Sequence, residues 1–151
     1  MTELKEGDKA PYFSLNNQNG KTVTLDSLKG KKVVLYFYPQ DSTPTCTVEA
    51  CNLRDNHAKL KKAGYTILGI SPDSEQKHRN FIAKQNLPFD LLADTETKMV
   101  QDYGVWAEKT LFGRTYMGVL RTTFLLDENG IITEIIRKVV SKDHAKQILK
   151  K

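Results

Sequence analysis

Residues 31–39, KKVVLYFYP, carry the strongest structural signal in the chain. The run is continuously apolar and rich in β-branched and aromatic residues, which is typical of a strand buried on both faces. A helical pattern follows from about Thr43 to Lys62 and ends at Gly64, and YTILGIS (65–71) predicts a second buried strand. A strand, a helix and another strand in this order predict a right-handed parallel unit within an α/β sheet.

The remaining patterns extend this unit to a three-layer α/β sandwich. Two β-hairpins are predicted, one over 12–25 with Asn19-Gly20 in its turn and one over 121–138 with Asn129-Gly130 in its turn. The other expected elements are one helical turn before Gly30, a helix over 74–86 capped by Ser74, a strand over 88–92, and helices over 95–104 and 142–151. The second hairpin should add antiparallel strands, so we expect a central mixed sheet flanked by helices. A length of 151 residues fits one domain, 1–151.

Charge and hydropathy exclude several function classes. The net charge of +5 is scattered rather than gathered into a basic stripe, which argues against a nucleic-acid partner. No apolar run approaches the ~20 residues that span a bilayer, and the polar N-terminal segment lacks the apolar core of a signal peptide. We therefore expect a cytoplasmic protein with no membrane partner.

The segment YPQDSTPTCTVEAC (38–51) holds both cysteines of the chain. Thr43 suits a helix N-cap and Pro44 the first helical position, so Cys46 falls at the third helical position. Unpaired backbone N–H groups and the helix dipole favour a thiolate there, which is the nucleophilic form. The alternative is that Cys46 is a small buried hydrophobe on the apolar face of the helix, and the two interpretations are compatible.

Cys51 follows five residues later. In a regular helix the two Cα atoms would lie ~8–9 Å apart, beyond the ~7 Å that a disulfide allows. A bond between Cys46 and Cys51 would therefore require the first turns of the helix to unwind. Spacing alone leaves a redox couple and two unrelated cysteines equally open, and two cysteines are too few for a structural zinc site.

Several separated blocks resemble one known family. Pro39, Thr43 and Cys46 match the P-x-x-x-[ST]-x-x-C signature of peroxiredoxins. The segment FYPQDSTPTCTVEACNLRD resembles the active-site region of the bacterioferritin comigratory protein branch, the Q-type peroxiredoxins. Further matches lie in GDKAPYFSL, in GYTILGISPDS and in the segment 103–130, so the resemblance covers almost the whole chain.

This resemblance implies a thioredoxin-like fold with an N-terminal β-hairpin extension. It also implies reduction of hydrogen peroxide and organic hydroperoxides without metal, flavin or haem. We further expect recycling by thioredoxin or a similar dithiol reductant, and a monomer. Cys46 matches the peroxidatic cysteine and Cys51 the resolving cysteine. Thr43 matches the residue that bonds thiolate and peroxide, Pro39 the residue that shields the pocket, and Arg121 the arginine that closes it.

Four other positions carry alternatives or depart from the family pattern. Arg114 is as good a candidate as Arg121 on sequence alone, and only the match to R-x-[ST]-F-L-[IL]-D selects Arg121. Thr45 stands where the family usually has glycine, and Gln40 replaces a common lysine, so these two departures leave the substrate preference open. Glu49 is interpreted as a solvated helix residue.

Packing is the preferred interpretation for His57, as a core histidine, and for Trp106, Phe112 and Tyr116, whose alternatives are lining the pocket or forming a docking surface. Two other functions remain open. A thioredoxin-like disulfide oxidoreductase would normally carry C-x-x-C, which is absent. A peroxide sensor or a plain binding module is the other.

Overall fold

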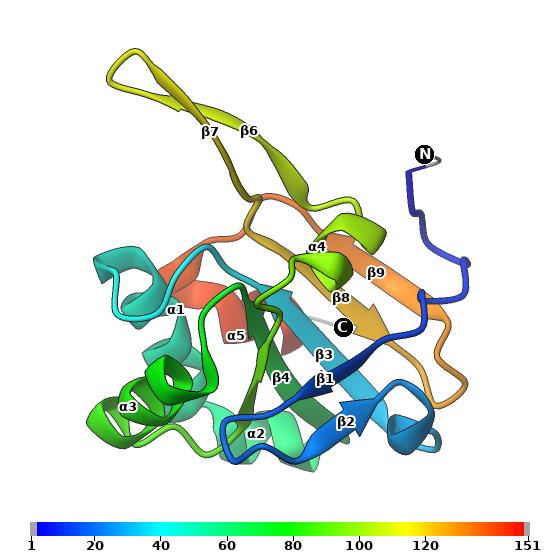
Figure 1. Cartoon of the computed structure of the whole chain (residues 1–151). Helices are drawn as coiled ribbons and strands as arrows, with labels where there is room; N and C mark the ends of the chain where they lie inside the picture. The colour runs from blue at the N-terminus through cyan, green and yellow to red at the C-terminus, as the bar shows by residue number, and fades with distance from the viewer. Residues whose placement is uncertain (1–2, 150–151) are drawn as a thin grey trace.

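A five-stranded mixed sheet forms the centre of the molecule, which a computed structural model describes over residues 3–149 (Figure 1). The strand order is β5-β4-β3-β8-β9. The strands span β3 (Lys32–Phe37), β4 (Tyr65–Ser71), β5 (Asp90–Ala93), β8 (Thr122–Leu126) and β9 (Ile132–Ile136). β3 pairs parallel with β4, β4 parallel with β5, and β8 antiparallel with both β3 and β9. The prediction of a mixed sheet is confirmed.

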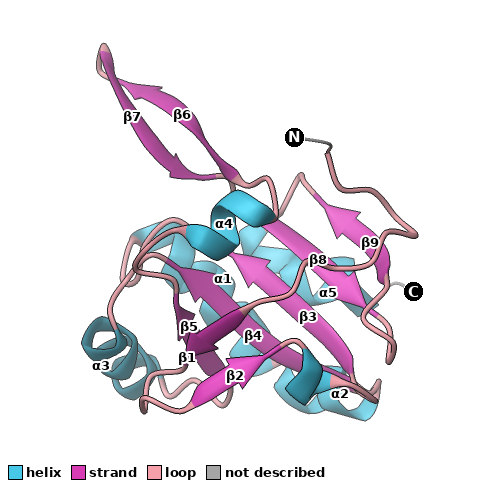
Figure 2. Ribbon diagram, turned by 45° about the vertical axis from the view of Figure 1, so that its right-hand side comes forward, coloured by secondary structure: helices cyan, strands magenta, loops and turns pink. Residues whose placement is uncertain are grey.

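Helices cover one face of the sheet, and a mixed layer covers the other (Figure 2). The first layer consists of α1 (Pro44–Asp55), α2 (His57–Lys62), α3 (Glu75–Gln85) and α5 (His144–Leu149), preceded by the 3-10 turn η2 (Ser141–Asp143). The second layer holds α4 (Lys98–Asp102), the 3-10 turn η1 (Asp26–Leu28) and the N-terminal hairpin of β1 (Ser14–Asn16) and β2 (Thr22–Thr24). The predicted N-terminal hairpin and three-layer sandwich are therefore confirmed.

Alternation along β3 explains why its sequence is apolar throughout. Val33, Leu35 and Phe37 belong to the core beneath the hairpin layer, whereas Val34 and Tyr36 belong to the core beneath the helices. Successive side chains of a strand point to opposite faces, so a central strand between two layers needs apolar residues at every position.

The predicted helical segment from about Thr43 to Lys62 is confirmed in extent, but it is divided at Asn56 into α1 and α2. Asn56 has ψ 12°, outside helical values, and its side-chain amide donates to the carbonyl of Asn52 at 2.9 Å. Asparagine competes in this way with the backbone hydrogen bonds of a helix. The last two residues of the predicted C-terminal helix, 150 and 151, lie outside the described residues.

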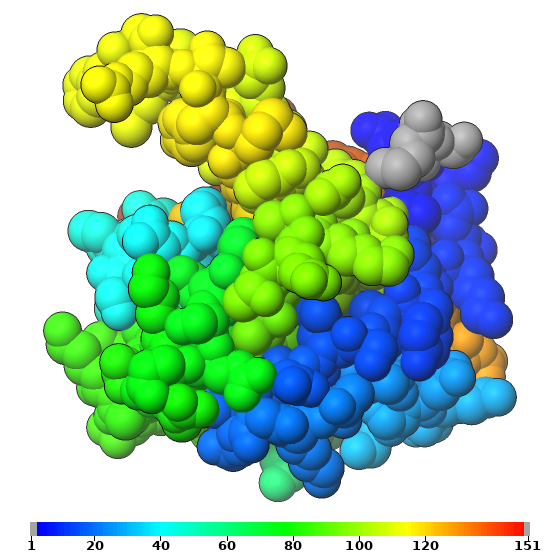
Figure 3. Space-filling view, viewed as in Figure 1, coloured from blue at the N-terminus to red at the C-terminus, as the bar shows by residue number. Residues whose placement is uncertain are grey.

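One hairpin was not predicted from the sequence. β6 (Trp106–Leu111) and β7 (Arg114–Val119) pair antiparallel around Phe112 and Gly113, both at positive φ. Asparagine or aspartate usually occupies the first of these turn positions, so the turn carried no recognisable signal. Trp106 packs against the core, but Phe112 and Tyr116 are exposed, which contradicts their interpretation as packing residues. The tip of the β6–β7 hairpin projects away from the rest of the molecule (Figures 1 and 3).

Within residues 3–149, none of the helices combines the length and the apolar character that crossing a membrane requires.

Candidate active site

The first turn of α1 presents Cys46 at the carboxyl end of β3. Pro44 occupies the first helical position, and the side chain of Thr43 accepts a hydrogen bond from the Cys46 backbone N–H at 3.4 Å. The predicted N-cap is thus confirmed, with Cys46 at the third helical position. Cys46 is only 2% exposed. A cysteine so placed combines burial with the positive end of a helix, as both sequence interpretations require.

The loop that joins β3 to α1 is held by buried polar groups. Asp41 accepts a hydrogen bond from the hydroxyl of Tyr38 at 2.5 Å and lies 2.6 Å from Nδ1 of His78 on α3. The Asp41 backbone N–H donates to Asp73 at 2.7 Å. Ser42 follows at φ 65°, a conformation that is strained without glycine. These anchors fix the backbone that carries Pro39, which is half-buried, and Thr43.

Ligand atoms of Asp41, Asp73 and His78 lie within 4.8 Å of one another and in principle suit a metal ion. The same atoms already serve hydrogen bonds within the loop anchor: Asp73 also accepts from Ser71 at 2.7 Å, and Nε2 of His78 lies 3.0 Å from the Leu92 carbonyl. The cluster is therefore explained by its structural role.

Arg121, 75 residues after Cys46 in the chain, lies beside the cysteine. Its Nη2 lies 3.2 Å from Sγ of Cys46, and its Nη1 donates to Oε1 of Glu49 at 2.6 Å. Arg121 lies in the short link between β7 and β8, whereas Arg114 is exposed on β7. Arg121, which the family motif selected over Arg114, is the arginine beside Cys46.

The interpretation of Glu49 as a solvated residue is wrong. Its side chain is fully buried, one turn after Cys46, because α5 packs against that face of α1. Burial raises the pKa of Glu49 to about 7, although the neighbouring Arg121 guanidinium acts in the opposite direction. The one signal in the sequence is that Glu49 lies three residues after Cys46 and so shares its side of the helix.

Behind Glu49 lies a second residue that sequence reasoning missed. Nε2 of His144, the first residue of α5, lies 3.6 Å from Oε2 of Glu49 and 2.7 Å from the hydroxyl of Thr123 on β8. Burial lowers the pKa of His144 to about 4, with the positive charge of Arg121 acting in the same direction and a hydrogen bond to Gln147 opposing it. His144 is therefore uncharged at neutral pH.

Cys51 lies on the same unbroken helix as Cys46, and both are free thiols. Its half-buried Sγ lies 3.4 Å from Oε1 of Gln85, at the end of α3. A regular helix keeps positions five residues apart beyond disulfide distance. In this state the two cysteines are separate.

The remaining sequence candidates lie outside this cluster. Thr45 is exposed on the first turn of α1, and Gln40 is exposed in the loop before it. His57 is half-buried, with its ring 6.3 Å from that of Phe89, so its interpretation as a core histidine is wrong. The fully buried histidines of the described chain are His78 and His144.

Comparison with known proteins decides the family. Residues 6–135 match the model of the AhpC/TSA family. Peroxiredoxin Bcp of Bacillus subtilis is 48% identical over 97% of this chain and 93% of the relative, and that of Escherichia coli is 44% identical over 99% and 96%. This chain belongs to the peroxiredoxins of the AhpC/TSA family.

Solved structures agree with this assignment. Peroxiredoxin Q of Xanthomonas campestris superposes with a TM-score of 0.86 at 38% identity, covering 91% of this chain and 87% of that one. A mutant of PrxQ from Xylella fastidiosa gives a TM-score of 0.92 at 29% identity, covering 99% and 96%. The predicted resemblance to the bacterioferritin comigratory protein branch and the thioredoxin-like fold are confirmed, and the chain is a peroxidase.

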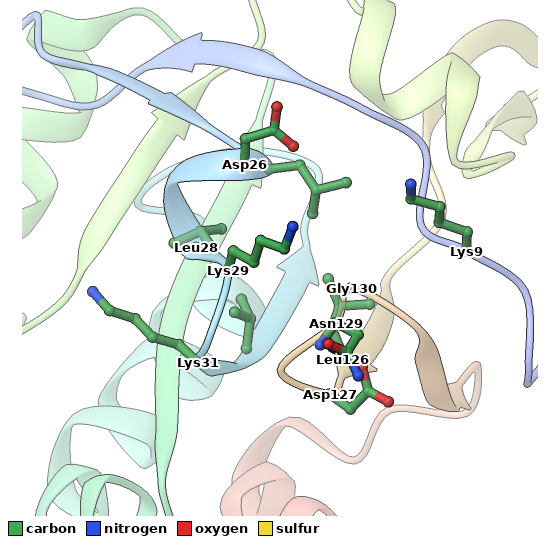
Figure 4. Close-up of a pocket in the computed structure, with 11 residues that line it drawn as sticks. Lys9, Asp26, Leu28, Lys29, Lys31, Leu126, Asp127, Asn129 and Gly130 are labelled. Atoms are coloured by element: carbon green, nitrogen blue, oxygen red, sulfur yellow. Dashed lines mark hydrogen bonds between the residues drawn. The ribbon is translucent and has the colours of Figure 1, made fainter.

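A separate hollow of about 90 Å³ lies between η1 and the turn after β8 (Figure 4). It is lined by side chains that include Lys9, Asp26 and Asp127. The hollow lies at the end of the sheet where β3 begins, whereas Cys46 follows the carboxyl end of β3. The two sites are therefore at opposite ends of the strands of this peroxiredoxin.

Proposed function

We propose that this peroxiredoxin reduces hydrogen peroxide and organic hydroperoxides through Cys46, and that Cys51 then resolves the oxidised cysteine. The observation that carries the proposal is the contact of 3.2 Å between the Arg121 guanidinium and the Cys46 sulfur at the start of α1. A buried thiol that faces both a helix N-terminus and a permanent cation is placed to react as a thiolate.

In the first step the Cys46 thiolate attacks the terminal oxygen of the peroxide. The S–O bond forms as the O–O bond breaks, giving a sulfenic acid and an alkoxide or hydroxide that takes up one proton. Negative charge moves from sulfur to the departing oxygen. Preorganised donors stabilise charge where it develops, and Arg121 and the N–H groups of the first turn of α1 fill this role.

Thr43 supports the step in two ways. Its hydroxyl oxygen accepts from the Cys46 N–H and so fixes the first turn, and its hydroxyl proton is directed toward the Gln40 carbonyl at 3.4 Å. The latter contact is long, so the hydroxyl is free to turn toward a peroxide oxygen. Pro39 borders the same loop and shields the sulfur from water.

In the second step the Cys51 thiol condenses with the sulfenic acid, releasing water and forming an intramolecular disulfide. The helix has to unwind locally for this bond to form. A dithiol protein of the thioredoxin class then reduces the disulfide by exchange. Support for organic substrates comes from the Xanthomonas campestris bacterioferritin comigratory protein, whose structures concern alkyl peroxide reduction.

The test is peroxide consumption coupled to NADPH oxidation through thioredoxin and its reductase. Wild type should turn over, and Cys46→Ser should be inactive. Cys51→Ser should not turn over: Cys46 should be oxidised to the sulfenic acid and, by a second equivalent of peroxide, to the sulfinic acid. Turnover by Cys46→Ser would refute the mechanism.

The same experiment separates the alternatives. A disulfide oxidoreductase would reduce a protein disulfide without consuming peroxide. A peroxide sensor would be oxidised at Cys46 but turn over slowly and bind a partner only when oxidised.

A further inference from the structure

Gln85, the last residue of α3, contacts α1 at two points. Its side-chain oxygen Oε1 accepts a hydrogen bond from the thiol of Cys51 at 3.4 Å. Its backbone carbonyl accepts from Nη1 of Arg54, three residues after Cys51 on α1, at 2.7 Å. Residues three apart on a helix lie on the same side, so Cys51 and Arg54 both face the end of α3.

The backbone contact fixes Gln85 relative to α1. The last carbonyl groups of a helix lack partners within the helix and lie at the negative end of its dipole. Arg54 supplies a donor and a positive charge at this point, and its Nε donates to Asp55 at 2.9 Å. With its backbone held in this way, Gln85 presents its side chain to the Cys51 sulfur.

The residue after Cys51 is anchored on another side of α1. Nδ2 of Asn52 donates to the Lys142 carbonyl at 2.7 Å, and its Oδ1 accepts from the Ala145 N–H at 2.8 Å. These two bonds tie the end of α1 to η2 and α5 without using the Cys51 side chain. Unwinding that frees Cys51 can therefore stop at Asn52, and it has to break the contact with Gln85.

The bond between Cys51 and Gln85 requires a protonated thiol. An amide oxygen only accepts, so the hydrogen between the two atoms belongs to the sulfur. A thiolate is the form of cysteine that attacks another sulfur. Cys51 therefore has to leave Gln85 and lose its proton before it can react.

We propose that Gln85 is a positioning residue for the second half of the peroxidase reaction, because it holds Cys51 in its resting place and so sets how fast a disulfide follows oxidation of Cys46. The inference deepens the proposed function and rests on the resolving role of Cys51. After release, the Cys51 thiolate attacks the Cys46 sulfur, and the S–S bond forms as the S–O bond breaks. The departing hydroxide takes up a proton to give water, the Cys46 sulfur is reduced, and the Cys51 sulfur is oxidised.

The time that Cys51 spends on Gln85 also affects over-oxidation. The sulfenic acid of Cys46 either condenses with Cys51 or reacts with a second peroxide to give the sulfinic acid. Faster disulfide formation should raise, by the same factor, the peroxide concentration at which half of Cys46 becomes sulfinic acid during turnover. Mass analysis of Cys46 measures this concentration, and an unchanged value in a variant with faster disulfide formation would contradict the proposal.

The main test compares Gln85→Ala with wild type. Rapid mixing with one equivalent of peroxide, followed by acid quenching and mass analysis, separates the rate of Cys46 oxidation from the rate of disulfide formation. Gln85→Ala should leave the first rate unchanged, and it should raise the second about two- to fivefold, as expected for the loss of one weak hydrogen bond. Disulfide formation at an equal or lower rate than in wild type would overturn the proposal.

Two further variants show whether the acceptor itself is responsible. Gln76→Ala removes another glutamine of α3, which bonds to Arg79 and Asn80 of the same helix, and both rates should match those of wild type. Gln85→Glu restores an acceptor for the Cys51 thiol, so disulfide formation should be no faster than in wild type. Disulfide formation as fast as in Gln85→Ala, in either of these variants, would overturn the proposal.

The reactivity of Cys51 in Cys46→Ser tests the contact without peroxide. Adding Gln85→Ala to this variant should raise the rate of Cys51 alkylation by iodoacetamide about two- to fivefold, and an unchanged rate would overturn the proposal. If wild type forms no bond between Cys46 and Cys51, the proposed resolving function fails, although faster alkylation would still show that Gln85 holds the thiol. If the disulfide forms equally fast with and without Gln85, the proposed function stands and the role of Gln85 is refuted.

Discussion

The Arg121 guanidinium lies 3.2 Å from the Cys46 sulfur, although 75 residues separate the two in the chain. Cys46 lies in the first turn of the capped helix α1. Arg121 directly precedes β8, which pairs antiparallel with β3, the strand before α1. The contact therefore depends on the pairing of β8 with β3 in the central sheet.

Replacing Arg121 by alanine should slow Cys46 oxidation by about 100- to 1,000-fold, because one preorganised donor is lost from the site of charge development. Rapid mixing with peroxide, followed by thiol alkylation and mass analysis of Cys46, measures this rate. Arg114→Ala is the matched control, since Arg114 is exposed on β7 and should leave the rate unchanged. A normal rate in Arg121→Ala would show that the guanidinium is not part of the site.

Replacing Thr43 by valine should destabilise the protein by about 1 kcal/mol, because the N-cap of α1 is lost, and should also slow Cys46 oxidation. Ser74→Ala removes the equivalent cap of α3, where the serine accepts from the Lys77 N–H at 3.2 Å. It should cause a similar loss in urea denaturation but no loss of rate. Equal rate losses in both variants would mean that Thr43 acts through stability alone.

Oxidation should change the first turns of α1 more than any other helix. Reduced protein should show protected amides across residues 46–55, and oxidised protein should lose this protection once Cys46 and Cys51 are joined. Amide hydrogen exchange in both states, with mass mapping of the disulfide, measures the change. Unchanged protection, or an oxidised form linked only between chains, contradicts local unwinding.

Between about pH 4.5 and 6.5, Glu49 and His144 should change the free energy of unfolding with pH in opposite directions. The pKa of Glu49 is raised to about 7 by burial, so its contribution is complete below the unfolded value and is lost as pH rises through 7. The pKa of His144 is lowered to about 4 by burial, so its contribution is complete above the unfolded value and is lost as pH falls through 4.

Single variants should separate these two effects. Glu49→Gln should lose on the order of 2 kcal/mol of stability as pH falls from 6.5 to 4, whereas His144→Phe should gain a similar amount as pH falls from 7 to 4.5. Urea denaturation at a series of pH values gives both slopes. Parallel slopes in the two variants would show that one of the pKa directions is wrong.

Local patterns in the sequence determined the sheet core and the placement of Cys46. The apolar run of β3 predicts burial on both faces because alternation leaves no side of a central strand in water. Thr43, Pro44 and Cys46 lie within one helical turn, so capping and proline geometry fix their arrangement without help from the rest of the chain.

Tertiary structure alone decided which distant groups meet the cysteine. Apart from the family motif that selects Arg121, nothing in the local sequence distinguishes it from Arg114, because it is the pairing of β8 with β3 that brings Arg121 to the sulfur. A glutamate on a helix is normally solvent-exposed, and nothing in the sequence marks Glu49 as different. It is buried because α5 covers that face of α1 and places His144 behind it. Burial changes the charge of a carboxyl group through desolvation, which depends on neighbours that arrive from elsewhere in the chain.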